Sequence, residues 1–472
     1  MAKEYDLVIL GGGTGGYVAA IRAAQLGLKT AIVEKEKLGG TCLHKGCIPS
    51  KVLLRSAEVY ATTKRGDEFG VQIEGVSLNF SKVQERKEKI IGQLHNGVQY
   101  LMKKGKIDIY EGTGRILGPS IFSPLPGTIS VEMNNGTENE MLIPKNVIIA
   151  TGSRPNPLNF PIDRQYVLTS DEALEMEYLP KSILIVGGGV IGVEWASMLA
   201  DFDVDVTILE YEDRILRTED KEISKEMQRL FKKKKINIYT GAKVLPETLR
   251  KDDGVSIQAE INGEVRSFHA EKLLVTVGRK ANIEGIGLEN TAIQIDKGVI
   301  KTNDFYQTKE THMYAIGDVI GGLQLAHVAS HEGIIAVEHI AGLKPQPLDY
   351  SLVSTCIYSQ PEVAKVGLTE EEAKEQGYKV KIGKFSFRSI GKALIFGESD
   401  GFVKMVVDEE TDDLLGVHMI GPHVTELISE AGLARVLDAT PWEISQTIHP
   451  HPSLSEVIGE AALAVDGNAL HG

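Results

Sequence analysis

The chain has 472 residues, a formal net charge of −14 and 42% hydrophobic residues. This length and apolar content predict two to four domains with cores of their own, while the negative charge argues against nucleic acid or anionic membranes as general partners. No run of about 18 apolar residues predicts a transmembrane helix. With three cysteines and no signal or transit peptide before the first strand, the chain is expected in the cytoplasm, although a mature organellar chain would look the same.

The N-terminus predicts a strand, a glycine-rich turn and a helix. An apolar run from Asp6 to Leu10 predicts a buried strand, a helix follows through Gln25, and residues 30–33 predict a second strand. Glycines allow a tight turn and the close approach of a pyrophosphate, whose charge a helix N-terminus favours. An acid that ends the second strand can accept from a ribose hydroxyl. The residues assigned to this dinucleotide site are Gly11, Gly13, Gly16 and Glu34.

Two cysteines, Cys42 and Cys47, follow this unit. In a regular helix their Cα atoms would lie roughly 8.6 Å apart, whereas a disulfide tolerates less than about 7 Å. A bridge therefore requires the backbone to leave the ideal helix, and Gly46 is a permissive residue at that point. We predict a redox-active, exchangeable disulfide. Reduced buried thiols are the alternative, and no metal site is predicted because Cys356 lies far away in sequence.

The strand, turn, helix and strand pattern occurs a second time. Strands are predicted at 182–186 and 204–209, with a helix at 193–200 between them. Two such units imply two nucleotide cofactors, and Glu210 would repel a 2′-phosphate, so the second site should prefer NAD to NADP. Arg214 and Arg217 could bind a phosphate, but we interpret them as solvated surface charges. The glycines of this second turn are Gly187, Gly189 and Gly192.

Other segments complete the chain. A helix is predicted near Ser81 to Lys104, and strands at 147–150 and 273–277 each enter a glycine turn, which is either the exit from a nucleotide-binding domain or an ordinary strand end. The segment 313–319 carries Asp318, which could bind cofactor hydroxyls or cap its own region.

Beyond a linker at Pro345 and Pro347, strands at 402–407 and 415–420 predict an antiparallel sheet with helices to one side. Near the C-terminus, His451 lies between two prolines, and Glu456 follows five residues later. A carboxylate at that distance could orient the imidazole and raise its basicity, as a catalytic dyad requires. A surface histidine is the alternative.

Together these segments resemble the pyridine nucleotide-disulfide oxidoreductases over essentially the whole chain, and within that family the members that oxidise dihydrolipoamide. The resemblance implies an α/β fold with two Rossmann-like dinucleotide-binding domains and a C-terminal α+β interface, or dimerisation, domain. The implied boundaries are 1–150 for the first part of an FAD-binding domain, 151–278 for an NAD-binding domain, 279–346 for a central FAD-binding segment and 347–472 for the interface domain.

The resemblance also assigns cofactor contacts. In addition to the first glycine turn and its acid, the implied FAD site includes Lys51, Gly114, Thr151, Gly152, Asp318 and Ala326. In addition to the second glycine turn and Glu210, the implied NAD site includes Glu194, Val244 and Gly278. Lys51 and Glu194 match positions near the reactive part of the flavin.

The implied reaction is oxidation of dihydrolipoamide to lipoamide, with electrons passing through a Cys42–Cys47 disulfide and FAD to NAD⁺. By resemblance, Cys42 exchanges with the substrate, Cys47 faces the flavin, and His451, held by Glu456, takes protons from the dithiol. In this family the histidine serves the other subunit, which implies a homodimer. The implied partners are a dihydrolipoyl domain as substrate and the acyltransferase core of a 2-oxo acid dehydrogenase complex, or glycine cleavage.

The sequence departs from the commonest family pattern between the cysteines, where Leu43-His44-Lys45 replaces Leu-Asn-Val, and at Pro450 and Ala281. His44 and Lys45 either alter the thiol pKa or are neutral variation. A glutathione-reductase-like enzyme is one alternative but would carry an arginine in place of Glu210, and a mercuric-reductase-like enzyme would carry further C-terminal cysteines. A mainly structural role in a complex is the other alternative, although every expected reactive residue is present.

Overall fold

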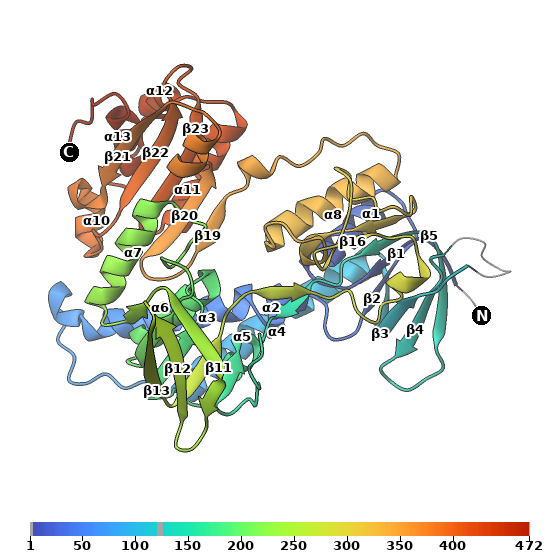
Figure 1. The fold of residues 1–472 in the computed structure, drawn as a ribbon. Coiled ribbons are helices and arrows are strands. Elements are labelled where there is room, and N and C mark those ends of the chain that lie inside the picture. Colours follow the sequence, from blue (N-terminus) through green and yellow to red (C-terminus); the bar gives the residue numbers. More distant parts are fainter. Residues whose placement is uncertain (1–2, 120–125, 472) are drawn as a thin grey trace. The chain divides into compact units, whose positions relative to one another are not determined.

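The computed structural model describes residues 3–119 and 126–471, which form two compact units (Figure 1). Unit 1 is built from Met1–Val52, Gln84–Asn156 and Gly278–Leu348. Unit 2 is built from Leu53–Val83, Pro157–Val277 and Asp349–Gly472. None of the helices in the described ranges is both long enough and apolar enough to cross a membrane.

Unit 1 contains a sheet with a parallel centre. Strand β1 (Lys3–Leu10) lies between β2 (Thr30–Glu34) and β5 (Glu140–Ile149), and β18 (Met313–Ala315) pairs with the other edge of β5. Helix α1 (Thr14–Gln25) connects β1 to β2. The residues of β2 are all buried, as expected for a strand covered on both faces.

Helices α1 and α8 (Ala326–Ile340) pack closely because small residues meet at their contact. A Cβ added to Gly333 would lie 2.8 Å from the carbonyl oxygen of Gly15, and one added to Gly15 would lie 3.0 Å from the Ala329 oxygen. Figure 1 shows α1 beside α8, and this close approach holds the helix that follows the first glycine turn in its place in unit 1.

The remaining elements of unit 1 surround this sheet. Strand β3 pairs parallel with β2 and antiparallel with β4, and the short strands β6 and β15 pair antiparallel. These elements are α2 (Gly40–His44), β3 (Asp108–Ile116), β4 (Ile129–Met133), β6 (Ser153–Pro155), β15 (Arg279–Ala281), β16 (Ile295–Asp296), β17 (Val299–Ile300) and the 3₁₀ helices Leu288–Asn290 and Gly317–Ile320. Helices α3 (Cys47–Lys64) and α4 (Phe80–Lys104) have residues in both units.

Unit 2 contains a second parallel sheet, in the order β10-β9-β8-β14-β7. Helix α6 follows β8, and α7 buries one face that includes Ile223, Met227 and Phe231. These elements are β7 (Val167–Thr169), α5 (Ser170–Ala173), β8 (Ser182–Val186), α6 (Val190–Asp201), β9 (Asp205–Leu209), α7 (Lys221–Lys233), β10 (Asn237–Tyr239) and β14 (Lys272–Val275). An antiparallel sheet follows β10 in the chain, with β11 (Ala242–Arg250), β12 (Val255–Ile261) and β13 (Glu264–Ala270).

The C-terminal part of unit 2 is an antiparallel sheet in the order β19-β20-β23-β22-β21. Strands β22 and β23 are buried along their whole length, and α11 and α13 pack against the sheet. Its elements are β19 (Thr355–Ile357), β20 (Glu362–Gly367), α9 (Glu370–Glu375), β21 (Val380–Ser386), α10 (Gly391–Phe396), β22 (Phe402–Asp408), β23 (Leu414–Gly421), α11 (Val424–Val436), α12 (Pro441–Gln446) and α13 (Glu456–Ala464). The 3₁₀ helices of unit 2 are Gly66–Phe69, Tyr350–Leu352 and Phe387–Ser389.

The predicted fold class is confirmed. Both strand, turn, helix and strand units form as predicted, and the C-terminal strands form an antiparallel sheet. The predicted linker prolines lie between α8 and the next 3₁₀ helix, where the chain passes from unit 1 to unit 2 at residues 348/349. The two glycine turns that were interpreted either as domain exits or as ordinary strand ends lead into β6 and β15, which pair with each other.

Candidate active site

The first glycine turn is held by its own backbone and by Glu34. Gly11 has φ +103°, and a Cβ added there would lie 2.2 Å from the Ala150 oxygen. A Cβ added to Gly16 would lie 1.9 Å from the Gly11 oxygen, so only glycine fits at either position. The buried Glu34 carboxylate accepts from Gly12 N–H at 2.6 Å and from Glu36 N–H at 2.7 Å. Glu34 therefore shapes the turn, and its predicted contact with a ribose stays a prediction.

The residues of this turn fit a dinucleotide. The space where a Cβ of Gly13 would lie is open, with Gly40 Cα 4.0 Å away, and Gly13 directly precedes the first residue of α1. A helix N-terminus that presents backbone N–H groups to open space is suited to a pyrophosphate. Gly13, Gly16 and the N-terminus of α1 would hold the pyrophosphate of bound FAD.

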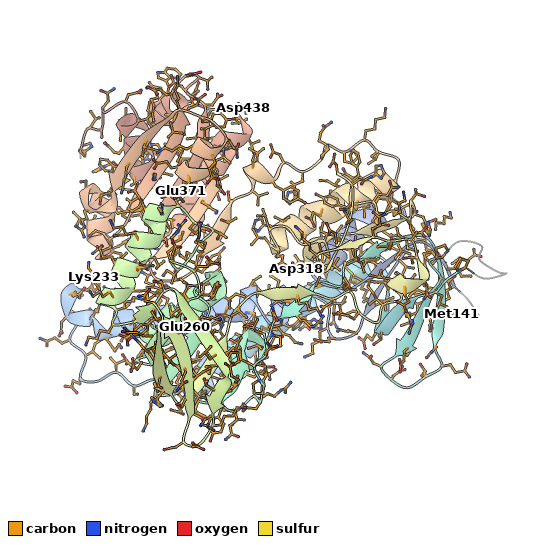
Figure 2. All side chains as sticks on the ribbon, viewed as in Figure 1. Met141, Lys233, Glu260, Asp318, Glu371 and Asp438 are labelled. Atoms are coloured by element: carbon orange, nitrogen blue, oxygen red, sulfur yellow. The ribbon has the colours of Figure 1, made fainter. Side chains whose placement is uncertain are left out.

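Asp318, labelled in Figure 2, belongs to a hydrogen-bonded group in unit 1. Ser153 donates to Asp318 Oδ2 at 2.5 Å, and the Arg279 guanidinium donates to the Ser153 hydroxyl at 2.7 Å and to its carbonyl at 2.8 Å. The Arg279 and Asp318 charges are 3.8 Å apart. Neither Ser153 nor Arg279 was predicted as a site residue from the sequence. Each directly follows a predicted glycine turn, and that position could have indicated it.

The other predicted FAD residues lie in unit 1 as well. Thr151 donates to the Asn282 carbonyl at 2.7 Å, and Gly152 has φ +68° with no atom within 4 Å of an added Cβ. Gly114 lies on β3 where a Cβ would meet Leu10 at 2.7 Å, so its environment is a packing contact. Ala326 is the first residue of α8.

The thiol pair lies where one helix ends and another begins. Helix α2 ends at His44, Lys45 leaves helical geometry with φ −136°, and α3 begins at Cys47. The backbone between the cysteines therefore departs from an ideal helix, which is what a bridge between them would require. Both cysteines are half-buried and present as thiols, and Cys42 forms a hydrogen bond with Cys47. The redox-active disulfide between them stays a prediction.

The thiol contact strongly affects ionisation. The hydrogen bond with Cys47 raises the pKa of Cys42 most, and burial raises it further. A hydrogen bond with Thr14, at the start of α1, and the positive charge of Lys51 lower the pKa of Cys42 and oppose these effects. The pair thus lies beside the first residue of the helix that would hold the FAD pyrophosphate, with a lysine close enough to stabilise a thiolate.

The second glycine turn, in unit 2, repeats the design of the first. Gly187 has φ +105°, and a Cβ added to Gly192 would lie 2.0 Å from the Gly187 oxygen. The buried Glu210 carboxylate accepts from Gly188 N–H and, at 2.7 Å, from Glu212 N–H. Around Gly189, just before α6, the space is open. Gly189, Gly192 and the N-terminus of α6 would hold the pyrophosphate of bound NAD.

The remaining predicted NAD residues lie at different places in the chain. Glu194 is buried on α6, and its carboxylate accepts from Tyr358 N–H at 2.9 Å. Val244 lies on β11 opposite Ala259. Gly278 has φ +107° with no atom within 4 Å of an added Cβ, and it directly precedes β15. Gly278 belongs to unit 1 and the other two residues to unit 2.

The interpretation of Arg214 as a solvated charge is wrong. Only 11% of its side chain is exposed, and its guanidinium pairs at 3.2 Å with Glu371, a residue labelled in Figure 2. Arg217 is exposed, as predicted. Glu371 is 157 residues further along the chain, so no local pattern in the sequence could have revealed the pair.

The predicted histidine and carboxylate form a dyad in unit 2. His451 Nδ1 lies 2.9 Å from Glu456 Oε1, and Ser453 N–H donates to Glu456 Oε2 at 2.9 Å. Burial raises the pKa of Glu456, but the hydrogen bonds from Ser453 and His451 outweigh it and lower that pKa overall. The His451 side chain is 79% exposed, and with Nδ1 donating to the carboxylate, Nε2 is left to accept a proton. Cys42 and Cys47 lie in unit 1.

Known proteins resemble this chain over its whole length. The family described as pyridine nucleotide-disulphide oxidoreductase matches residues 5–333, and its dimerisation domain matches residues 353–462. A protein of Bacillus subtilis named dihydrolipoyl dehydrogenase is 73% identical, and one of Zymomonas mobilis with the same name is 44% identical, each over 100% of both chains.

Solved structures are similar over nearly the whole length. The structure of LpdA from Mycobacterium tuberculosis has a TM-score of 0.88 at 25% identity and covers 98% of this chain and 99% of its own. A Cu(II) complex of RclA, a flavoprotein disulfide reductase of Escherichia coli induced by hypochlorous acid, has a TM-score of 0.86 at 25% identity, with 98% and 99% covered. From its two glycine turns to its C-terminal sheet, the chain belongs to the pyridine nucleotide-disulphide oxidoreductase family.

Proposed function

We propose that this chain catalyses the dihydrolipoyl dehydrogenase reaction, the oxidation of dihydrolipoamide to lipoamide with reduction of NAD⁺ to NADH. The observation that carries the proposal is the contact of Cys42 with Cys47 beside Thr14, at the first glycine turn. A thiol pair next to a dinucleotide site is what dithiol oxidation requires. The Bacillus subtilis relative, with 73% identity over the full length, bears the name of this activity.

The chain's own residues carry out a thiol–disulfide exchange. Starting from the disulfide form, one sulfur of the substrate attacks Cys42, and the Cys42–Cys47 bond breaks. The second substrate sulfur then displaces Cys42, which closes the lipoyl disulfide and leaves both cysteines as thiols. Bound FAD and bound NAD⁺ supply the two-electron acceptors that return the cysteines to the disulfide.

His451 is the proposed base for this exchange. The thiolate is the nucleophile, so a group that takes up a proton near neutral pH is required. Because Glu456 holds Nδ1 at 2.9 Å, Nε2 is the nitrogen that accepts the substrate proton. The lowered pKa of Glu456 keeps its carboxylate ionised, which favours the imidazolium that forms.

The assembly and location are also proposed. A dimerisation domain matches residues 353–462, which supports a homodimer in which His451 serves the partner's thiol pair. We further propose a cytoplasmic enzyme that acts on the dihydrolipoyl domain of a 2-oxo acid dehydrogenase complex and binds its acyltransferase core. Glu210, as a buried anion at the second turn, supports NAD over NADP.

The test is an anaerobic absorbance titration of the purified protein with dihydrolipoamide and then with NAD⁺. A flavin spectrum that develops a long-wavelength thiolate-to-flavin band, followed by NADH absorbance, is expected. The Cys42→Ser variant should lose dihydrolipoamide oxidation, while Cys356→Ser, a matched control on β19, should keep it. A protein that responds only to NADPH and another disulfide would contradict the substrate assignment, and a protein without flavin would contradict the first cofactor site.

A further inference from the structure

The Leu38 carbonyl, which precedes α2, accepts hydrogen bonds from two histidines. His44 Nε2 lies 2.9 Å and His95 Nδ1 lies 3.0 Å from the Leu38 oxygen. The two rings are 5.3 Å apart and meet edge to face. A carbonyl oxygen has two lone pairs and can only accept, so both facing nitrogens carry protons. His44 lies between the two cysteines, on α2, while His95 lies on α4.

Leu38 is itself tightly placed under the first glycine turn. Its side chain is 5% exposed, and a Cβ added to Gly12 would lie 2.7 Å from Leu38 Cδ2. The next residue, Gly39, has φ +106°, donates from N–H to the Gly12 oxygen at 2.8 Å and precedes α2. The position of the Leu38 carbonyl therefore sets the start of the helix that carries Cys42.

We propose that His44 and His95 are positioning residues that together hold the Leu38 carbonyl and so fix α2, keeping Cys42 in contact with Cys47. This inference rests on the proposed function only for the role of Cys42 as the exchange thiol. It gives a physical task to His44, one of the residues in which the segment between the cysteines departs from the commonest family pattern.

The ion pair next to this segment does not replace the two histidines. The ion pair of Lys45 with Glu36, at 2.6 Å, joins side chains that are 41% and 53% exposed, and such pairs contribute little to stability.

The protonation of His44 suits this role. Burial lowers the pKa of His44 most, and the nearby charges of His95 and Lys37 lower it further. The hydrogen bond to Leu38 and the charge of Glu36 raise the pKa but do not outweigh these effects. His44 therefore acts as a neutral donor at neutral pH.

The two hydrogen bonds allow a test in which donors are kept or removed. A glutamine amide nitrogen occupies about the place of a histidine Nε2, and an asparagine amide nitrogen that of Nδ1. His44→Gln and His95→Asn therefore keep the donors, whereas His44→Ala and His95→Ala remove them. His312→Ala is the matched control, because His312 makes a comparable 2.7 Å hydrogen bond to the Pro126 carbonyl elsewhere in unit 1.

The readout is the rate at which iodoacetamide alkylates Cys42 in the reduced, flavin-loaded protein, followed by mass spectrometry. Loss of one donor should loosen α2 and raise the Cys42 rate by about fivefold, with a further increase in the double alanine variant. His44→Gln, His95→Asn and His312→Ala should stay within about twofold of the wild type. If His44→Ala does not fold, the His95 variants give the same comparison from α4.

Two results would overturn the proposal. One is an unchanged Cys42 rate in both single alanine variants and in the double variant. The other is a rate in His44→Gln and His95→Asn equal to that of the alanine variants, which would assign the effect to ring packing. Dihydrolipoamide oxidation by the wild type is measured in parallel. If the wild type does not oxidise dihydrolipoamide but the alanine variants still change the alkylation rate, the proposed function is contradicted and the role of the histidines is not.

Discussion

Lys404 Nζ and Asp220 Oδ2 lie 3.0 Å apart although their side chains are only 2% and 1% exposed. Lys404 also pairs with Glu222 at 3.0 Å and Glu370 at 2.7 Å. Asp220 is the N-cap of α7 and Lys404 lies on β22. The ion pairs therefore link the part of unit 2 that carries the second glycine turn to the C-terminal sheet of the same unit. Burial lowers the pKa of Lys404, but these carboxylates outweigh it and raise that pKa overall.

Removing the lysine should therefore destabilise unit 2 strongly. Lys404→Ala leaves Asp220 as a buried charge without its cation, and we expect a loss of about 3–5 kcal/mol in the free energy of unfolding. The control is Lys379→Ala, whose pair with Glu410 joins side chains 70% and 67% exposed and should change stability little. Urea denaturation of the cofactor-loaded protein measures both, and equal stability of the two variants would contradict this account.

His418 should make stability depend on pH. It is buried completely, and burial lowers its pKa to about 4 from 6.5, against the hydrogen bond to the Leu368 carbonyl. Between these values the unfolded chain binds a proton that the folded chain does not, so the stabilisation is complete above pH 6.5 and is lost as the pH falls toward 4. The loss attributable to this residue is about 3 kcal/mol.

The His418→Gln variant keeps a donor for the Leu368 carbonyl but cannot take up a proton. Its free energy of unfolding should fall less steeply than that of the wild type between pH 6.5 and 4, the window given by the pKa of His418. His269→Gln, at an exposed position on β13, is the control and should keep the wild-type slope. Parallel slopes for all three proteins would show that His418 does not carry this dependence.

Substitutions in the two glycine turns should impair the binding of two different cofactors. A Cβ at Gly16 would overlap the Gly11 oxygen at 1.9 Å, and one at Gly192 would overlap the Gly187 oxygen at 2.0 Å. We expect Gly16→Ala to lower the flavin content, and Gly192→Ala to keep flavin but weaken NAD binding, each by about tenfold or more. Absorbance after purification and calorimetric titration with NAD⁺ measure the two effects. Gly97→Ala, in open space on α4, should change neither.

The dyad should matter for dithiol oxidation and not for the flavin–NADH reaction. His451→Gln removes the proposed base, so kcat with dihydrolipoamide should fall by about a hundredfold or more. NADH-dependent reduction of ferricyanide, which needs no proton from a dithiol, should be retained. His471→Gln is the control, since His471 also pairs with a carboxylate, Glu460, at 2.7 Å and is 71% exposed. A similar loss in both variants would argue against a specific role for His451.

The local patterns of the sequence predicted the fold well. Each glycine turn has requirements that only glycine meets, such as the positive φ of Gly11 and Gly187, and these are visible in sequence. Apolar runs such as 182–186 predicted buried strands that the structure confirms. The departure from helix between Cys42 and Cys47 followed from the geometry of a disulfide and is also observed.

Contacts between distant residues could not be predicted in this way. Arg214 looked solvated because its partner, Glu371, lies on another element, and the same holds for Lys404 and Asp220. Nothing near His95 indicates that its ring approaches Leu38, 57 positions earlier. Such pairs depend on how distant elements pack together, and the charge pattern along one element does not indicate that packing.

The hydrogen bonds of Glu34 and Glu210 to their own turns have a consequence for cofactor affinity. Each carboxylate already accepts from the N–H of the glycine at the centre of its turn, so the backbone that would meet a pyrophosphate is ordered before a ligand arrives. Ordering a loop on association costs conformational entropy, which subtracts from the binding free energy. Because both turns are already ordered in the folded protein, the conformational entropy of ordering them is lost during folding and not on binding. More of the free energy of the phosphate interaction then contributes to the cofactor affinity.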